Sequence, residues 1–293
     1  MSVYKILFKV FCFIGILPSF LLASDPISFD SLFKKQIGLR SITTLEYLSS
    51  GNADFYNTFP FISVYNDGRN YTDNKQFSLR QNFIYSLNNK LDLMLSAKAS
   101  FVRSDSEQTS FFAPTSYTHE QYTNFDNLSL GFVYSFENLG DFVPQLSASI
   151  SVFDRVRFTT AKKLFYASSG NVQFSFKTFS DPLILSLYLG GAYNSTLHFK
   201  SNKVNFGNAV FAGFNGSIIL SPKVSLDIGF SQSYQQGSKF NGRQYTSSYS
   251  IPNISLGFSY SLDDDTAISL SGSASGSNSA PNSIFALSLW KKF

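Results

Sequence analysis

The chain has 293 residues, of which 14% are charged and 17% are aromatic, and its formal net charge is +4. The low net charge and high aromatic content argue against a disordered chain, and the lack of clustered Lys and Arg argues against a nucleic-acid-binding protein. The mean hydropathy is −0.02 although the chain has few charged residues. The uncharged polar residues Ser, Asn, Thr and Gln therefore offset the apolar ones.

The first 23 residues have the layout of a cleaved secretory signal peptide. Two lysines precede an apolar stretch from Val10 to Leu22, which ends in small residues. This stretch is shorter than the roughly 20 residues of a membrane helix, so an uncleaved anchor is the less favoured alternative. The only cysteine lies within it, and we therefore expect an exported chain without disulfides. We expect residues 24–36 to form a short periplasmic segment, either a plug or a mobile end.

A period of two in the hydrophobic pattern begins at residue 76. Apolar and polar residues alternate over 76–87 and again over 91–103, and a short Asn-rich turn joins the two runs. Two alternating runs joined in this way predict a β-hairpin. No run of 18 or more apolar residues follows the leader, so the pattern does not predict a membrane helix.

The same unit recurs four more times, and one strand is expected at each end. The further hairpins span 128–152, 172–189, 210–230 and 254–270; the single strands span 37–48 and 284–293. Five tight turns and six longer connections then join twelve strands. One of the longer connections joins the first strand to the first hairpin, and the other five are polar stretches that we expect to be loops: 104–123, 154–169, 195–205, 235–249 and 273–281.

An even strand number with alternating short and long connections is typical of bacterial outer-membrane barrels. Strands in lipid must pair every backbone group, and only a closed sheet leaves no free edge. We therefore predict an all-β fold over 37–293: a transmembrane antiparallel up-and-down barrel of about twelve strands, with both termini on the periplasmic side. A soluble sandwich with its apolar face inward is the alternative. The small, uncharged polar face argues against it, because soluble surfaces are usually rich in charge.

With the apolar face outward, five charged side chains point into the predicted lumen: Arg80, Asp92, Lys98, Lys177 and Asp227. Rings of charge set pore selectivity, so three cations against two anions predict a polar pore with a slight preference for anions. In the alternative interpretation these groups pair across the lumen and help to close it.

The last strand carries a candidate signal for the barrel-assembly machinery. Apolar residues alternate toward a C-terminal aromatic residue, as is usual for outer-membrane barrels: Phe285, Leu287, Leu289 and Phe293. Lys291 departs from the pattern, and Trp290 is one position out of phase. We expect either a bulge at this point or a weaker signal.

The sequence offers little chemistry for catalysis. Its two histidines, His119 and His198, fall in predicted loops or strand ends without a neighbouring serine, so a membrane hydrolase is the least favoured function. The run Asp263–Asp265 is better explained as a turn than as a calcium site, because no complete ligand loop follows it. We expect no enzyme activity, cofactor or metal.

The function that we expect is a passive channel for small solutes. The alternative is a surface-interaction barrel that binds a partner through 104–123 and 235–249.

Several segments resemble a family of exported barrels assigned to transport in the phenol meta-degradation pathway. The similar segments are Tyr47–Gly51, Ser78–Ala97, Asn127–Phe136, Ser221–Tyr234 and Asn253–Leu262. The resemblance implies an outer-membrane transporter of small, including apolar, molecules, and the family supplies no catalytic residues.

Overall fold

The computed structural model describes residues 37–51, 70–110, 113–158, 161–178, 182–200, 202–244, 246–277 and 280–293. The predicted signal peptide at 1–23 and periplasmic segment at 24–36 lie outside these ranges. Within the described ranges there is no helix with the length and apolar character needed to cross a membrane.

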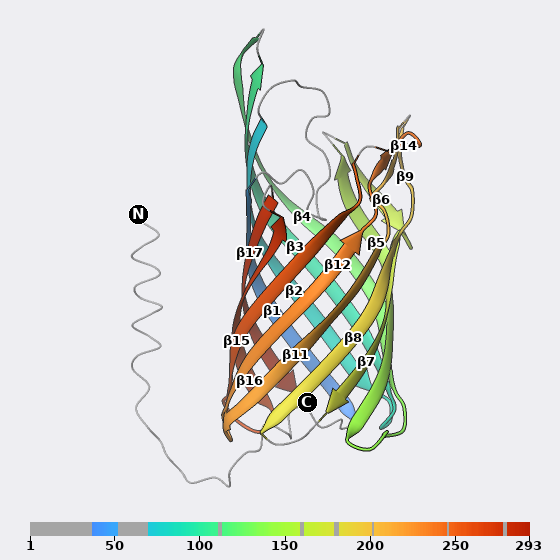
Figure 1. The fold of residues 1–293 in the computed structure, drawn as a ribbon, viewed down its shortest axis with the longest axis vertical. Helices are drawn as coiled ribbons and strands as arrows, with labels where there is room; N and C mark the ends of the chain where they lie inside the picture. Colours follow the sequence, from blue (N-terminus) through green and yellow to red (C-terminus); the bar gives the residue numbers. More distant parts are fainter. Residues whose placement is uncertain are drawn as a thin grey trace, which may run out of the picture.

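Twelve long antiparallel strands close into a barrel, which confirms the predicted fold and strand number (Figure 1). They are β1 (Gly38–Gly51), β2 (Asn70–Ser86), β3 (Leu91–Ser110), β4 (Ala113–Ser135), β5 (Phe142–Phe158), β7 (Ser169–Thr178), β8 (Leu183–Asn194), β11 (Ala209–Ser221), β12 (Val224–Gln235), β15 (Tyr249–Ser261), β16 (Thr266–Ser277) and β17 (Ala280–Lys292). Each strand pairs with the next strand of this series, and β17 returns to pair with β1 along eleven residues. Closure leaves no edge strand, so the backbone groups of the wall are paired within it.

The outer face of the barrel is apolar. Leu79 on β2, Leu187 on β8 and Leu256 on β15 are each more than half exposed, although all three lie in the middle of well-paired strands. In a soluble sandwich these residues would form the core, whereas here they cover the outside. The alternation therefore has the orientation expected for a wall that faces lipid.

Short turns join the strands at one end of the barrel, called the turn end from here on; the opposite end is the loop end. In the turn after β2, the Asn88 Oδ1 atom accepts hydrogen bonds from the backbone N–H groups of Lys90 (2.8 Å) and Leu91 (2.9 Å). After β15, Asp263 Oδ1 accepts one from the N–H of Asp265 at 2.9 Å. Asn and Asp favour tight turns because they make these local bonds, which supports the interpretation of 263–265 as a turn. The C-terminus also lies at the turn end (Figure 1).

Two of the predicted loops are instead paired strands. The β3–β4 ladder runs from Leu91↔Tyr134 to Ser110↔Ala113 and so includes the stretch 104–123, except for 111–112, which lie outside the described residues. Its far part rises well above the rest of the wall (Figure 1); the described residues 103–110 and 113–123 are called the arm. The stretch 273–281 likewise belongs to the β16–β17 ladder, except for 278–279, which lie outside the described residues. Beyond the membrane both faces of a hairpin meet water, so these strands pair without an apolar alternation that the sequence could reveal.

The other long connections carry short strands. Along 154–169, β5 continues and pairs with β6 (Ala161–Tyr166). A separate sheet at the loop end, called the cap sheet, contains β9 (Leu197–Phe199), β10 (Asn202–Asn205), β13 (Lys239–Phe240) and β14 (Arg243–Gln244). It joins the predicted loops 195–205 and 235–249 through the pair Val204↔Phe240. The two segments are far apart in sequence, so neither reveals this pairing by its own pattern.

Candidate functional site

The inner face of the barrel is lined mainly by hydroxyl groups. Because side chains alternate along a strand, every apolar position on the outer face is followed by a position that points inward. Small polar residues occupy most of these positions and are buried by the neighbouring strands: Ser78, Ser86, Ser100, Ser135, Ser151, Ser175, Ser225, Ser259 and Ser261. Such a lining presents hydrogen-bonding groups and leaves space, because serine fills little of a barrel this wide.

A three-charge cluster lies on the inner face of β1, β2 and β3. Arg80 and Lys98 are directly opposite each other in the β2–β3 ladder, a placement that is unfavourable for like charges. Glu46 on β1 lies between them, with its carboxylate 3.4 Å from an Arg80 guanidinium nitrogen and 3.6 Å from the Lys98 ammonium nitrogen. It also accepts a hydrogen bond from the Ser78 hydroxyl at 3.0 Å. Glu46 therefore compensates both cations within the wall.

A second ion pair lies closer to the turn end. The Arg40 guanidinium on β1 donates to Asp92 on β3 at 3.2 Å and to the Ser86 hydroxyl on β2 at 3.0 Å. All three side chains are at least partly buried, and Ser86 is fully buried. The pair links three successive strands through one guanidinium group, whose planar array of donors suits this arrangement.

A bulge brings in a further carboxylate. The β3–β4 register shifts between Lys98 and Ala99, so that β4 has one additional residue at this point. Asp126, at the bulge, accepts hydrogen bonds from the Ser100 hydroxyl at 2.9 Å and the Asn124 amide at 3.0 Å. Its other carboxylate oxygen is buried and has no hydrogen-bond partner in the structure.

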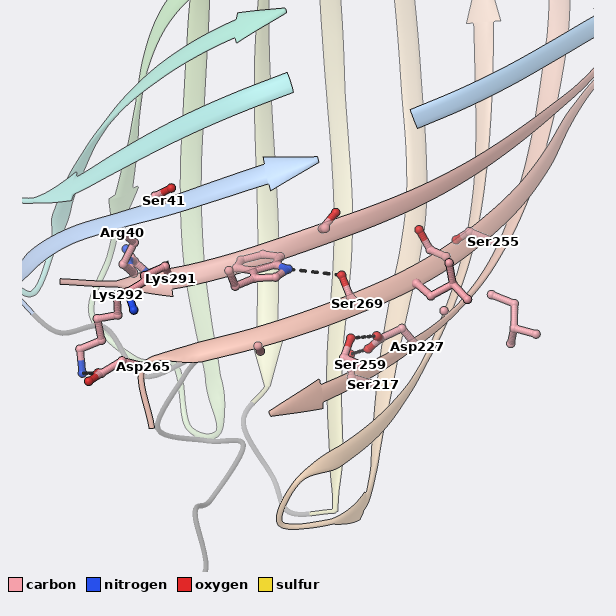
Figure 2. Close-up of a pocket in the computed structure, with 17 residues that line it drawn as sticks. Arg40, Ser41, Ser217, Asp227, Ser255, Ser259, Asp265, Ser269, Lys291 and Lys292 are labelled. Carbon is pink, nitrogen blue, oxygen red and sulfur yellow. Dashed lines mark hydrogen bonds and ion pairs between the residues drawn. The ribbon is translucent and has the colours of Figure 1, made fainter. Parts of the chain in front are cut away.

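The β11–β17 side of the wall holds a cavity of about 370 Å³ near the turn end (Figure 2). At one side of it the Asp227 carboxylate accepts hydrogen bonds from Ser217 at 2.5 Å and Ser259 at 2.8 Å. The Trp290 indole N–H donates to the Ser269 hydroxyl at 3.3 Å. Arg40 lies at the opposite side from Asp227, as Figure 2 shows. The cavity therefore combines one aromatic ring with hydroxyl groups, the Asp227 carboxylate and the Arg40 guanidinium.

Two further aromatic rings lie against inward-facing glycines. A Cβ atom on Gly213 would lie 2.5 Å from the Tyr188 hydroxyl, and one on Gly190 would lie 2.5 Å from the Phe211 ring. Glycine at these positions lets the rings pack directly on the wall of β8 and β11. The rings thus line the interior while taking little space from it.

The structure places each predicted lumen residue at an inward position of its strand. Arg80, Lys98 and Asp92 belong to the clusters described above, and Asp227 lines the cavity. Lys177 lies opposite Ser186 in the β7–β8 ladder. Sequence analysis missed five inner charged groups, which are Arg40, Glu46, Asp126, Asp154 and Lys292, and the aromatic rings of Trp290, Tyr188 and Phe211. With these carboxylates included, the described part of the wall has no excess of cations, which removes the basis for an anion preference.

The predicted assembly-signal residues lie on the outer face of the last strand, where Phe285, Leu287, Leu289 and Phe293 are all exposed. Of the two alternatives expected at Trp290, a bulge or a weaker signal, the bulge is not present in the strand. The β1–β17 ladder is regular from Ser50↔Asn282 to Arg40↔Lys292, so Trp290 is out of phase because it points inward. Lys291 then falls on the outer face, in phase with Leu289.

The histidines do not meet a serine in the described structure. The ring nitrogens of His119 contact the Asp105 carboxylate and the Gln121 amide, both on the arm. His198 lies on the cap sheet, where its backbone carbonyl accepts a hydrogen bond from the Lys163 ammonium group at 2.8 Å. Among the described residues, no group of three or more His, Cys, Asp or Glu side chains is placed to hold a metal ion.

Solved structures resemble this barrel in fold, although their sequences differ from it. An outer-membrane channel from Pseudomonas putida F1 has a TM-score of 0.61 at 12% identity, covering 88% of this chain and 97% of the channel. CymD, a monoaromatic hydrocarbon channel, has a TM-score of 0.50 at 10% identity over 95% of both chains. The transport unit of the Escherichia coli autotransporter AIDA-I also has a TM-score of 0.50 at 10% identity, covering 95% of this chain and 94% of the transport unit. No family model and no curated protein matches the sequence. The chain thus has the fold of outer-membrane β-barrels.

Proposed function

We propose that this protein is an outer-membrane channel for the passive diffusion of small solutes. One observation carries the proposal: a closed wall, apolar outside, surrounds a hydroxyl-lined interior that holds a cavity of about 370 Å³. The turn end would face the periplasm and the loop end the exterior, as is usual for such barrels. The charged groups on the β1–β4 side are compensated within the wall, so they would add little selectivity by charge.

The solute class follows from the lining. Trp290, Tyr188 and Phe211 offer aromatic surface, whereas the serines offer hydrogen bonds. This mixture suits small molecules with both an apolar and a polar part. The likeness to a monoaromatic hydrocarbon channel supports the same class, and so does the sequence resemblance to transporters of the phenol meta-degradation pathway.

The test is single-channel conductance of the purified protein in planar lipid bilayers. We expect discrete current steps with little preference for anions or cations. Trp290 is the only tryptophan, so its fluorescence reports on the cavity, and we expect added aromatic solutes to quench it in a saturable way. The Trp290→Phe variant is the control for residual tyrosine emission. A folded barrel that neither conducts nor shows saturable quenching would contradict the proposal.

The arm favours a second candidate function, namely binding to a partner at the cell surface. It extends the β3–β4 ladder well beyond the pairing of β4 with β5, and β2 accompanies it as far as the pair Asn70↔Gln108 (Figure 1). Replacing 104–123 by a short turn would leave conductance unchanged and abolish surface binding. If binding to cells or matrix proteins survived this replacement, the arm would have no such role.

We further propose the processing and assembly route of the chain. A signal peptide at 1–23 would be removed on export, leaving 24–36 as a periplasmic segment. The barrel-assembly machinery would recognise the alternation that ends at Phe293, and the outer-membrane lipid would then surround the apolar face. N-terminal sequencing of the protein from isolated outer membranes would test the cleavage site.

A further inference from the structure

The cap sheet has one apolar face and one basic face. Leu197, Phe199 and Val204 are buried on the first face, where they pack against side chains that include Val156 and Phe165 of β5 and β6. Alternation places Lys203 on the opposite face of β10, directly across from His198. Lys239 of β13 shares this face, across from Asn205. Two lysines thus lie on the side of the sheet that the apolar core does not use.

These lysines line a cavity of about 290 Å³ at the loop end. The rest of its lining is neutral: Thr196, Asn205, Gly207, Asn208, Gln236, Gly237 and Gly242. From 182 to 262 the sequence contains a single acidic residue, Asp227, and that residue lies in the separate cavity near the turn end. No carboxylate therefore lines the loop-end cavity to compensate Lys203 and Lys239.

The shape of this cavity is fixed by its own hydrogen bonds. The Asn205 side chain accepts one from the Gly207 N–H at 2.8 Å and donates one to the Thr196 hydroxyl at 3.1 Å. The Gln236 side chain accepts one from the Asn208 N–H at 3.3 Å. Gly207 has a φ of +77°, and a Cβ atom there would lie 2.3 Å from the Gln236 carbonyl oxygen. The amide groups thus hold the loops together, and the two ammonium groups remain the main donors for a ligand.

We propose that this cavity binds a phosphate group, either of a lipid headgroup or of a small phosphorylated solute. Two ammonium groups supply six N–H donors and two positive charges, which matches a dianion with several acceptor oxygens. A fully exposed patch would be screened strongly by salt, whereas a concave site lined by fixed dipoles holds an anion more firmly. The site is separate from the cavity near Trp290, so it does not depend on the pore.

The test compares two double variants of the full-length protein in neutral detergent. Lys203→Gln with Lys239→Gln removes the charges that line the cavity. Lys200→Gln with Arg243→Gln removes the same charge from the same part of the molecule, but from residues outside the cavity lining. Heat-dependent gel mobility verifies that each barrel is folded. Titration with inorganic phosphate is followed by ³¹P NMR, and retention of phosphorylated lipid A is followed by native mass spectrometry.

We expect the first variant to lose about tenfold or more in phosphate affinity, the size of effect usual for hydrogen bonds to charged groups. The second variant should lose less than twofold. Tight retention of lipid A with weak binding of inorganic phosphate would identify the headgroup as the source, and comparable binding of both would identify a solute. Equal losses in the two variants, or no binding of either probe by the unmodified protein, would overturn the proposal.

Discussion

Strands β1–β4 and β11–β17 form two sides of one wall but differ in length and in what they carry inside. The first group has strands of 14 to 23 residues, and its inner face holds Glu46, Arg80 and Lys98 together with the Arg40–Asp92 pair. The barrel strands of the second group have 12 or 13 residues. Their inner face holds serines, and Asp227 on it is bonded only to hydroxyl groups in the described structure.

The difference indicates two ways of making the inside of a barrel polar. Ion pairs between neighbouring strands fix long side chains against the wall and couple three strands at once. Serines leave space, and the cavity near Trp290 lies on the side that uses them. The outer faces of the two groups, by contrast, are alike in their exposed apolar residues.

The largest loss of barrel stability should come from a charged residue on the outer face. This loss should be equal for the β1–β4 side and the β11–β17 side of the wall. Leu79→Arg on β2 and Leu256→Arg on β15 each place a cation among exposed apolar residues near mid-strand. We expect each to destabilise the barrel by about 2–4 kcal/mol, the cost of Arg near the bilayer midplane. Urea unfolding in lipid vesicles, followed by Trp290 fluorescence, measures this change.

The matched control is Ser255→Arg, next to Leu256 but on the inner face. Ser255→Arg should destabilise the barrel less than Leu256→Arg does, because water in the lumen can hydrate the guanidinium group. If Ser255→Arg destabilised the barrel more than Leu256→Arg, the assignment of the two faces would be reversed on this side of the wall.

An intermediate effect is expected when one inner carboxylate is neutralised. Glu46→Gln removes the carboxylate that lies between Arg80 and Lys98, which face each other in the β2–β3 ladder. Removing one partner of a buried ion pair costs about 3–5 kcal/mol; since Arg80 is partly exposed, we expect about 2 kcal/mol in the same assay. Reversal potentials in planar bilayers should also shift toward anions.

Asp227→Asn provides the comparison on the other side of the wall. Asparagine can still accept a hydrogen bond from one of the two serine hydroxyls, Ser217 or Ser259, and donate one to the other, and no cation loses its partner in the described structure. We expect a change in stability of less than about 1 kcal/mol. Equal losses for Glu46→Gln and Asp227→Asn would mean that the ion pairs do not distinguish the two sides.

The wall could be predicted from the sequence because alternation is a local property. Runs such as 76–87 and 91–103 each contain the whole signal for a lipid-facing strand. The same logic reaches Glu46 and Arg40, which alternate with Leu45 and Leu39 on the first strand. Trp290 was recognised as out of phase, and its inward position explains why.

Features that depend on pairing between distant segments could not be predicted. Asp126 enters the interior through a bulge, which moves the alternation by one residue. The cap sheet forms only when the segments 197–205 and 239–244 pair with each other. Only the Asn241-Gly242 turn, with φ values of +48° and +82°, had a local signature, that of a two-residue hairpin. The strands of the arm pair without an apolar alternation in their sequence, so no local pattern predicts them.

The smallest effect concerns the arm and depends on pH. The hydrogen bond from the His119 ring, assisted by Arg103, holds the pKa of Asp105 below its ordinary range. A carboxyl with a lowered pKa stabilises the folded arm while it is ionised, so this contribution is lost as the pH falls through the lowered pKa. We expect the arm to loosen in acid, below the ordinary range of an aspartate, while the barrel remains closed. Limited proteolysis with pepsin, compared with heat-dependent gel mobility, would detect this difference.

Two variants test the role of Asp105. Asp105→Asn should abolish the pH dependence of the arm, whereas Asp73→Asn, which removes the nearby pair with Lys75, should leave the dependence on Asp105 in place. An arm equally resistant to pepsin in both variants and in the unmodified protein would show that the backbone pairing of β3 with β2 and β4 holds it, as backbone pairing holds the wall below.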